Sequence, residues 1–114
     1  SPIMRTFIFF RSLISHEEIT DIKLKTNSIE DSLSLDGKRK VNIDPGYLTL
    51  ANVVLATTKG YSHRIYLGKA IYGEVSLLYK EKTRTFIPNI FTYPDYQDKQ
   101  CIEMFIKARE FLKK

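Results

Sequence analysis

The segment from 62 to 81, SHRIYLGKAIYGEVSLLYKE, constrains the fold more than any other part of the chain. Two runs of alternating apolar and polar residues flank a Gly-Lys-Ala tripeptide at 68–70, a pattern typical of a β-hairpin. A slip of one residue turns every side chain to the other face, so face segregation selects the register. Pairing Leu67 with Ile71 separates the apolar from the polar side chains, and we predict this pairing.

In this register Arg64 lies opposite Glu74, and Tyr66 lies opposite Tyr72. A loop of three or of five residues gives the same pairing. A two-residue loop would instead set His63 against Glu74 and mix the two faces, so the prediction excludes it. The register also points His63 towards the core side, where a lone histidine is more often a hydrogen-bonded core residue than a ligand or a base.

The polar face of the predicted hairpin combines a guanidinium, a carboxylate and two phenols. These groups can bind a polar ligand by charge-assisted hydrogen bonds and stacking. The same groups are also found as an ordinary cross-strand ion pair with tyrosines on a wet sheet face. Both interpretations stay open. The candidate ligand-binding residues on this face are Arg64, Tyr66, Tyr72 and Glu74.

Three other segments have the character of strands, and a fourth is ambiguous. Residues 7–10 are apolar at every position, which predicts a strand covered on both faces. Residues 40–44 alternate and predict a half-exposed strand ended by Pro45, with Pro-Gly at the centre of a type II turn. Residues 83–87 predict a short strand. Residues 49–58 fit either a short helix or a strand, and the apolar spacing favours the helix.

Two helices are indicated by apolar periodicity and capping residues. Ser15 and Glu18 form a capping box, which predicts a helix over 16–34. The last helix is predicted to begin after Thr92 as its N-cap, with Pro94 in the first turn. The apolar stripe of the first helix comprises Ile19, Ile22, Ile29 and Leu33, and that of the last comprises Cys101, Phe105, Ala108 and Leu112.

These elements predict an α+β fold in a single domain over residues 1–114. We expect an antiparallel or mixed sheet of about four or five strands, with two or three helices packed mainly on one face.

A second candidate site involves the ends of other elements. Asn42 and Asp44 stand at the end of the predicted strand, and Tyr93 and Asp95 stand at the entry to the last helix. Turn chemistry alone explains Asp44, because its side chain can accept a backbone N–H of the turn. A pocket that joins these residues to the polar hairpin face would hold three carboxylates. Asp44, Glu74 and Asp95 are therefore a candidate divalent-cation set.

Composition excludes several classes of protein. No apolar run approaches the roughly 20 residues of a membrane span, so we expect no membrane partner. The two histidines, His16 and His63, are far apart, and with a single cysteine no zinc pattern is present. That lone Cys101 fits a reducing compartment, so we expect a cytoplasmic protein. Neither a P-loop nor a dinucleotide fingerprint is found, and no particular cofactor is indicated.

NIDPGYL, HRIYLGK and TYPDY are specific blocks within a stretch that runs from MRTFIFF to the last helix. Over this stretch the chain resembles an uncharacterised prokaryotic family, domain of unknown function 4416. The resemblance implies that the blocks meet in space. It also implies that a further N-terminal segment precedes Ser1, since members of the family are longer there. It supplies no functional residues.

Three function classes follow from these residues. We favour a ligand-binding or enzymatic domain that uses the polar sheet face to hold a small molecule, such as a nucleotide or another phosphate-bearing ligand. The first alternative is a module that binds RNA or single-stranded DNA, since the net charge is +5 and the pI is near 9.3. The second is a structural domain that forms a homo-oligomer.

Overall fold

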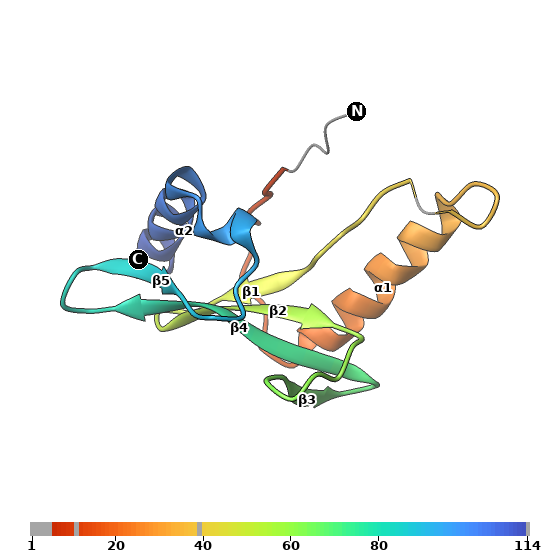
Figure 1. Ribbon diagram of the computed structural model, residues 1–114, viewed down its shortest axis with the longest axis horizontal. Coiled ribbons are helices and arrows are strands. Elements are labelled where there is room, and N and C mark those ends of the chain that lie inside the picture. The colour runs from red at the N-terminus through yellow and green to blue at the C-terminus, as the bar shows by residue number, and fades with distance from the viewer. Residues whose placement is uncertain (1–5, 11, 39, 114) are drawn as a thin grey trace.

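The computed structural model describes residues 6–10, 12–38 and 40–113 of the 114-residue chain. Two helices flank a twisted antiparallel sheet of five strands (Figure 1). The elements are α1 (Glu18–Ser32), β1 (Gly46–Leu48), β2 (Asn52–Thr57), β3 (Ile65–Gly68), β4 (Ile71–Lys80), β5 (Thr85–Pro88), the 3₁₀ turn η1 (Pro94–Gln97) and α2 (Lys99–Leu112). The α+β class predicted from the sequence is confirmed.

The long strand β4 organises the sheet. One edge of β4 pairs with β2, which in turn pairs with the edge strand β1. The other edge pairs with β3 near Gly73 and with β5 near Leu78. Between β3 and β5, none of the described strands pairs with this edge, and side chains bond to it instead. Asn89 Nδ2 donates to the Val75 carbonyl at 2.8 Å, and Thr92 Oγ1 donates to the Ser76 carbonyl at 2.6 Å. This gap is where the loop after β5 reaches the middle of β4.

The predicted hairpin is present, and most of its register is confirmed. Tyr66 pairs with Tyr72, as the face segregation required. The loop itself differs, because Lys69 and Ala70 form a two-residue turn with φ values of +52° and +61°. Gly68 rather than Leu67 therefore pairs with Ile71, and the register shifts between Tyr66 and Gly68. This bulge lets the short turn coexist with segregated faces.

The preference for a helix over 49–58 was wrong. Residues 52–57 form β2, an inner strand that pairs with β1 and β4. The β-branched pair Val53 and Val54 is buried there, at 2% and 6% exposure. Partners on both edges favour the strand, and they outweigh the weak helical spacing of the segment.

The NIDPGYL block is not a strand followed by a turn. Residues 41–45 have no regular structure, and β1 begins only at Gly46. Pro45 does not end the ladder: its carbonyl accepts the Ala56 N–H at 3.0 Å. Proline can still accept through its carbonyl and stand at the start of an edge strand. Upstream, the Ile43 N–H donates to Oε2 of the buried Glu30 in α1 at 2.6 Å.

Gly46 follows Pro45 because β1 and β2 approach closely there. A Cβ atom at position 46 would lie 2.5 Å from the Val54 carbonyl oxygen. We expect Gly46→Ala to lower the free energy of unfolding by about 1–3 kcal/mol, since the strand must shift to remove the overlap. Urea denaturation measures the change. Asp44→Ala, at an exposed position, is the control and should change stability by at most about 0.5 kcal/mol. Equal stability of both variants would contradict the close approach.

Residues 7–10 do not form the predicted strand. Their backbone belongs to none of the strands that the structure describes, and the side chains divide into two sets. Phe7 and Phe9 make edge contacts with Phe105 of α2, with ring centroids 6.0 and 5.2 Å apart. Ile8 and Phe10 are 72% and 85% exposed. The segment is thus covered on one side, by a helix rather than by neighbouring strands.

Both helices are shorter than predicted. The capping box is half formed: Glu18 accepts the Ser15 N–H at 2.6 Å, but the Glu18 N–H bonds to the Ser15 main-chain carbonyl. Asp98 rather than Thr92 caps α2, by accepting from the N–H groups of Gln100 and Cys101. Thr92 instead bonds within its loop and to β4, because η1 intervenes before α2 begins.

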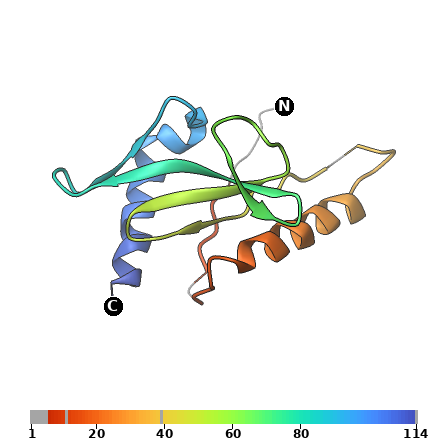
Figure 2. The same cartoon turned by 90° about the horizontal axis from the view of Figure 1, so that it is seen from below.

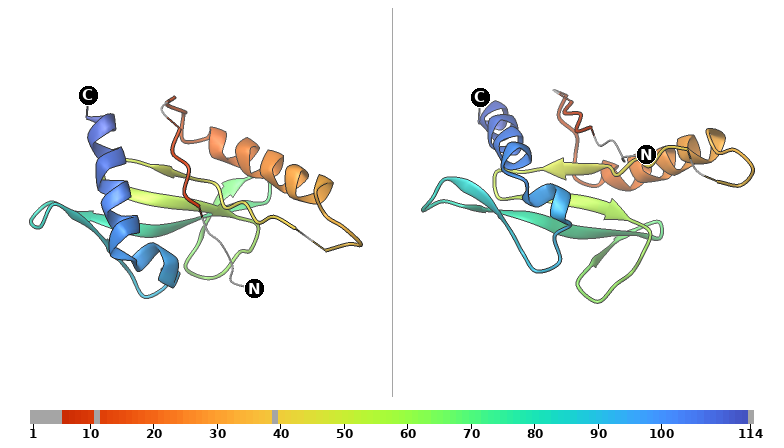
Figure 3. Two further views of the ribbon diagram at one scale, coloured as in Figure 1. Left: turned by 90° about the horizontal axis from the view of Figure 1, so that it is seen from above. Right: turned by 45° about the horizontal axis from the view of Figure 1, so that its top comes forward.

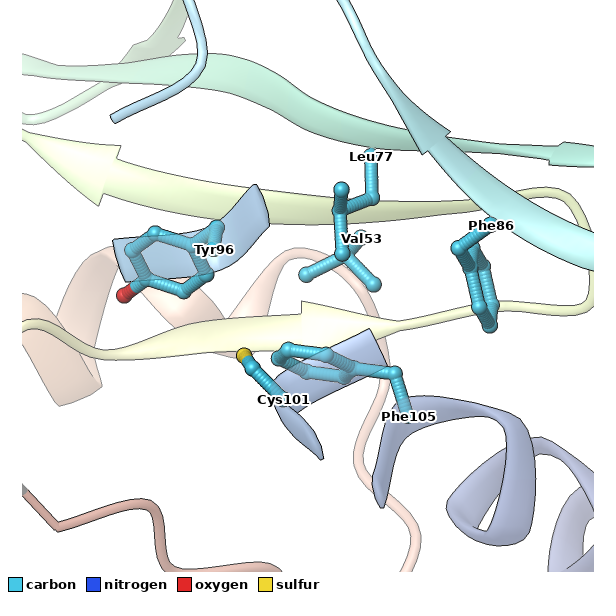
Figure 4. Close-up of a cluster of buried hydrophobic side chains, with 6 residues drawn as sticks. All are labelled: Val53, Leu77, Phe86, Tyr96, Cys101 and Phe105. Carbon is cyan, nitrogen blue, oxygen red and sulfur yellow. The ribbon is translucent and has the colours of Figure 1, made fainter. Parts of the chain in front are cut away.

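The core has two parts, one for each helix. Figure 4 shows the first, which α2 covers: Val53, Leu77, Phe86, Tyr96, Cys101 and Phe105. In the second, Ile19 of α1 packs on Ala56 and Ile71.

The two helices pack on opposite faces of the sheet. Leu55 packs in the first cluster and its neighbour Ala56 in the second, and adjacent residues of a strand point to opposite faces. The expectation that the helices lie mainly on one face is therefore corrected. Seen from below, α2 and α1 lie at opposite ends of the sheet (Figure 2). The view from above shows α2 crossing one end (Figure 3). The α2 face of β4 consequently remains open to loops at the other end.

Candidate functional site

A buried carboxylate on β4 is the centre of the candidate site. Glu74 is 3% exposed, and its Oε1 atom faces two basic side chains. His63 Nε2 lies 2.5 Å from this oxygen, and Arg64 Nε donates to it at 3.1 Å. A buried carboxylate is stable only when it is paired and hydrogen-bonded, and here two donors converge on one oxygen. We call His63, Arg64 and Glu74 the Glu74 cluster.

Arg64 is fixed by four contacts. Besides Glu74, its Nη1 atom donates to the Lys59 carbonyl at 3.0 Å, and Nη2 reaches the Tyr93 hydroxyl at 3.4 Å. The guanidinium carbon lies 4.5 Å from the centroid of the Tyr61 ring, a cation–π distance. Only 4% of the Arg64 side chain is exposed. Arg64 therefore neutralises Glu74 and orders the surrounding loops, and it is poorly placed to bind a solvent anion.

His63 is the member of the Glu74 cluster that reaches the surface. Its side chain is 18% exposed, against 4% for Glu74. The ring stacks on Phe91 with centroids 4.0 Å apart and planes inclined by 4°. Because Nε2 faces a carboxylate, the neutral ring carries its proton there and presents Nδ1 as an acceptor. The carboxylate and Phe91 together fix the orientation of the imidazole.

Three half-exposed rings surround the Glu74 cluster, and we call them the aromatic rim. Tyr61, Phe91 and Tyr93 are 53%, 48% and 52% exposed. Tyr61 comes from the β2–β3 loop, while Phe91 and Tyr93 come from the segment between β5 and η1. This second segment is anchored by the bonds of Asn89 and Thr92 to the gap in the β4 edge. The rim thus joins segments distant in sequence above one acidic residue.

Local backbone geometry places the β2–β3 loop over the sheet. The Arg64 N–H donates to the Tyr61 carbonyl at 3.0 Å, which closes a turn that turns both basic side chains towards Glu74. Gly60 lies flat against Tyr72, where a Cβ atom would approach the ring carbon Cζ to 2.7 Å. A larger residue at position 60 would have to displace either the Tyr72 ring or the loop.

The structure brings five of the eight residues predicted from the sequence into one neighbourhood. Arg64, Glu74 and Tyr93 belong to the contacts just described. Tyr66 and Tyr72 form an edge-to-face pair beside them, with centroids 5.3 Å apart. Glu74 and the Arg64 side chain are therefore not wet, since the β2–β3 and β5–η1 loops cover Glu74, whereas Tyr66 is 59% exposed.

The other three predicted residues lie elsewhere. Asn42 and Asp44 are exposed and precede β1, which β2 separates from β4, so two strand spacings of about 4.8 Å intervene. In the described parts of the chain, no hydrogen bond or ion pair joins Asn42 or Asp44 to the Glu74 cluster. Asp95 lies in η1, near the start of α2.

Asp95 contributes to the electrostatic environment of Cys101. Burial raises the pKa of the Cys101 thiol to about 11, and the carboxylates of Asp98 and Asp95 add to the effect. Cys101 is 2% exposed. This thiol is therefore protonated at neutral pH and fills the core, as its place on the apolar stripe indicated.

The candidate cation site formed by Asp44, Glu74 and Asp95 finds no support. Among the residues that the structure describes, no group of three or more His, Cys, Asp or Glu side chains could hold a metal ion. Glu74 already has two basic partners, which leaves its charge compensated without a metal.

Sequence reasoning missed His63 and Phe91. The chosen register assigned His63 to the core side, whereas the structure turns it towards Glu74 from the loop that precedes β3. The excluded two-residue loop would have set His63 against Glu74, so a signal was present. Nothing in the local sequence marks Phe91, which reaches His63 only through the anchored β5–η1 segment.

Two hollows in the described surface lie away from the Glu74 cluster. One, of about 450 Å³, is bounded by the β4–β5 turn and the end of α2. The other, of about 310 Å³, lies between the start of α1 and the residues Tyr47, Tyr66 and Leu67. His16 stacks on Tyr47 in this second hollow, with centroids 4.9 Å apart.

Comparison with known proteins places the chain in a family without assigning it an activity. No helix in the described residues is long and apolar enough to cross a membrane. The chain matches no curated protein and no solved structure. A family model described as Domain of unknown function (DUF4416) matches residues 1–111. The blocks that resembled this family in the sequence are thus part of a match over nearly the whole chain, and the protein belongs to the DUF4416 family.

Proposed function

We propose that this domain binds a small molecule with a flat ring, such as a nucleotide, on the aromatic rim above the Glu74 cluster. The observation that carries the proposal is the His63–Glu74 pair, a histidine held by a buried carboxylate and stacked on an exposed ring. Polar groups fixed among aromatic side chains are typical of small-molecule sites.

Each part of this surface has a place in the proposal. The exposed faces of Tyr61, Phe91 and Tyr93 offer stacking area at little cost in side-chain entropy. Nδ1 of His63 accepts a hydrogen bond from the ligand, or donates one when the ring is protonated. Lys59 lies in the same loop and supplies a positive charge for a phosphate group.

A reaction of the bound ligand would use the same pair. A histidine oriented by a carboxylate is a common general base, because the carboxylate fixes the tautomer and stabilises the imidazolium. His63 is therefore the group that would take or give a proton, and Glu74 would position it. Turnover of a bound ligand would be measured separately from its binding.

The experiment is a thermal-shift screen of nucleotides with wild-type protein and two histidine variants. A ligand at 100 times its Kd stabilises the native state by about 2.7 kcal/mol, so binding is visible as a higher midpoint. His63→Gln should abolish the ligand-dependent shift, because it removes the imidazole at the rim. His16→Gln, which alters the other histidine at the start of α1, should retain the shift. Equal responses of both variants, or no response of the wild type to any nucleotide, would rule the proposal out.

A second candidate is binding of single-stranded nucleic acid by the same rings. The specific observation that favours it is the row of exposed aromatic side chains on a chain of net charge +5. Stacking is tolerant of sequence, and phosphate contacts make affinity fall with salt. A filter-binding titration with oligonucleotides at two salt concentrations distinguishes this candidate from the first. Tight binding of mononucleotides with little salt dependence supports the small-molecule proposal.

A further inference from the structure

The cleft between the β4–β5 turn and the last turns of α2 is the larger of the two hollows. Its volume is about 450 Å³, within the range of small-molecule sites. Ile106 contributes an apolar wall. The other lining residues are Tyr79, Glu81, Arg84, Arg109, Glu110 and Lys113. Three cations and two carboxylates thus face one cleft, and none of these residues belongs to the Glu74 cluster.

Arg109 is the fixed element of this cleft. The residue is 7% exposed, and its Nε atom donates to the Leu50 carbonyl at 2.9 Å. Its guanidinium carbon lies 3.5 Å from the centroid of the Tyr79 ring. These two contacts hold the guanidinium plane and leave its terminal nitrogens beside the cleft. A guanidinium fixed in this way loses little freedom when it binds an anion.

Glu81 occupies the position from which an anion would approach Arg109. Its Oε2 atom lies 3.9 Å from Arg109 Nη2, which is too long for a hydrogen bond. The Glu81 side chain is 86% exposed, so it can swing into solvent without losing packing. An exposed pair of this kind contributes little to stability. Another oxyanion can therefore replace the Glu81 carboxylate at the guanidinium.

Arg84 supplies a second positive charge from the β4–β5 turn. Its backbone has a φ of +53°, a left-handed conformation that glycine adopts with less strain. The side chain is exposed and lines the cleft. Lys113 supplies the third charge from the end of α2. The geometry of these two residues leaves both side chains free to close on a ligand.

We propose that this cleft binds the phosphate group of a small molecule. The Arg109 guanidinium makes the fixed contact, and Arg84 and Lys113 add charge. A phosphate matches the fork of an arginine and benefits from several cations. Glu110, on the other wall, faces the rest of the ligand and can accept a hydrogen bond from a hydroxyl group. The site is independent of the nucleotide surface proposed above.

The test is a titration of the whole chain with inorganic phosphate at constant ionic strength, followed by amide chemical shifts in NMR. Saturable shifts are expected around Arg84 and Arg109. Arg84→Gly should weaken binding about tenfold while leaving the fold intact, because glycine suits the left-handed backbone. Glu81→Gln should strengthen binding several-fold, because it removes the competing carboxylate.

Lys82→Ala is the matched control, since Lys82 is exposed in the same turn and does not line the cleft. It should bind phosphate as the wild type does. The proposal is overturned if phosphate gives no saturable shifts, or if Lys82→Ala and Arg84→Gly weaken binding equally. It is also overturned if Glu81→Gln leaves the affinity unchanged, because Arg109 then serves only the end of α2.

Discussion

Replacing Glu74 with alanine is expected to lower the free energy of unfolding by about 3–5 kcal/mol. The change removes the shared acceptor of two basic side chains, of which the Arg64 side chain is only 4% exposed. Arg64 would then keep a buried charge without a counter-charge, and His63 would lose its only bond to the sheet that the structure records. The cost comes mainly from the uncompensated cation, since the pair itself adds little net stability. Urea denaturation with a two-state fit measures the loss.

Two further variants separate charge from shape. Glu74→Gln keeps the size of the side chain and one acceptor oxygen but loses the negative charge, so it should be destabilised by an intermediate amount. Glu81→Ala removes a carboxylate that is 86% exposed and should cost at most about 0.5 kcal/mol. A loss in Glu74→Ala no larger than that in Glu81→Ala would mean that Glu74 does not hold the loops over the sheet.

The hairpin was predictable because local rules and tertiary packing agree there. Alternation along both strands fixed which residues share a face, and Tyr66 does pair with Tyr72. Only the turn differed. Gly68, which the prediction placed in the loop, pairs with Ile71, and a bulge between Tyr66 and Gly68 accommodates Leu67. Face segregation constrains strands strongly and turns weakly, since one bulge restores the faces for more than one loop length.

The errors arose where distant segments decide the local structure. Residues 49–58 have spacing that fits a helix, but β1 and β4 on either side make residues 52–57 an inner strand. Residues 7–10 have the composition of a buried strand, but the side chains of Phe7 and Phe9 pack on Phe105 of α2. In each case one deciding partner, β4 or α2, lies many residues away, where no pattern within the segment can indicate it.

Only half of the candidate site was predicted, for the same reason. Arg64 and Glu74 follow from the register of one hairpin, so the sequence was enough to place them together. Phe91 reaches His63 only because Asn89 and Thr92 bond to an edge gap that exists between β3 and β5. Nothing in the sequence near Asn89, Phe91 and Thr92 indicates that gap. The NIDPGYL motif suggested that Asp44 belongs to the site. In the structure, this motif instead provides the glycine, Gly46, at which β1 approaches β2 closely.

Phe105→Ala should be the most destabilising substitution in the apolar core, at about 3–5 kcal/mol. Phe105 is 6% exposed, and its ring lies 5.2–6.4 Å from four others, those of Phe7, Phe9, Phe86 and Tyr96. Truncation leaves a cavity between α2 and the sheet, and also removes the ring on which the segment at 7–10 packs.

The second effect gives this variant a signature beyond lost stability. Amide hydrogen exchange at residues 7–10 should report the release of the segment, and near-ultraviolet circular dichroism should lose aromatic signal. Met104→Ala, which changes the adjacent and 38% exposed residue of α2, is the control and should cost about 1 kcal/mol or less. If Phe105→Ala lowers stability but leaves exchange at residues 7–10 unchanged, the segment is held by contacts other than Phe105. If both variants cost the same, α2 does not depend on this ring for its place on the sheet.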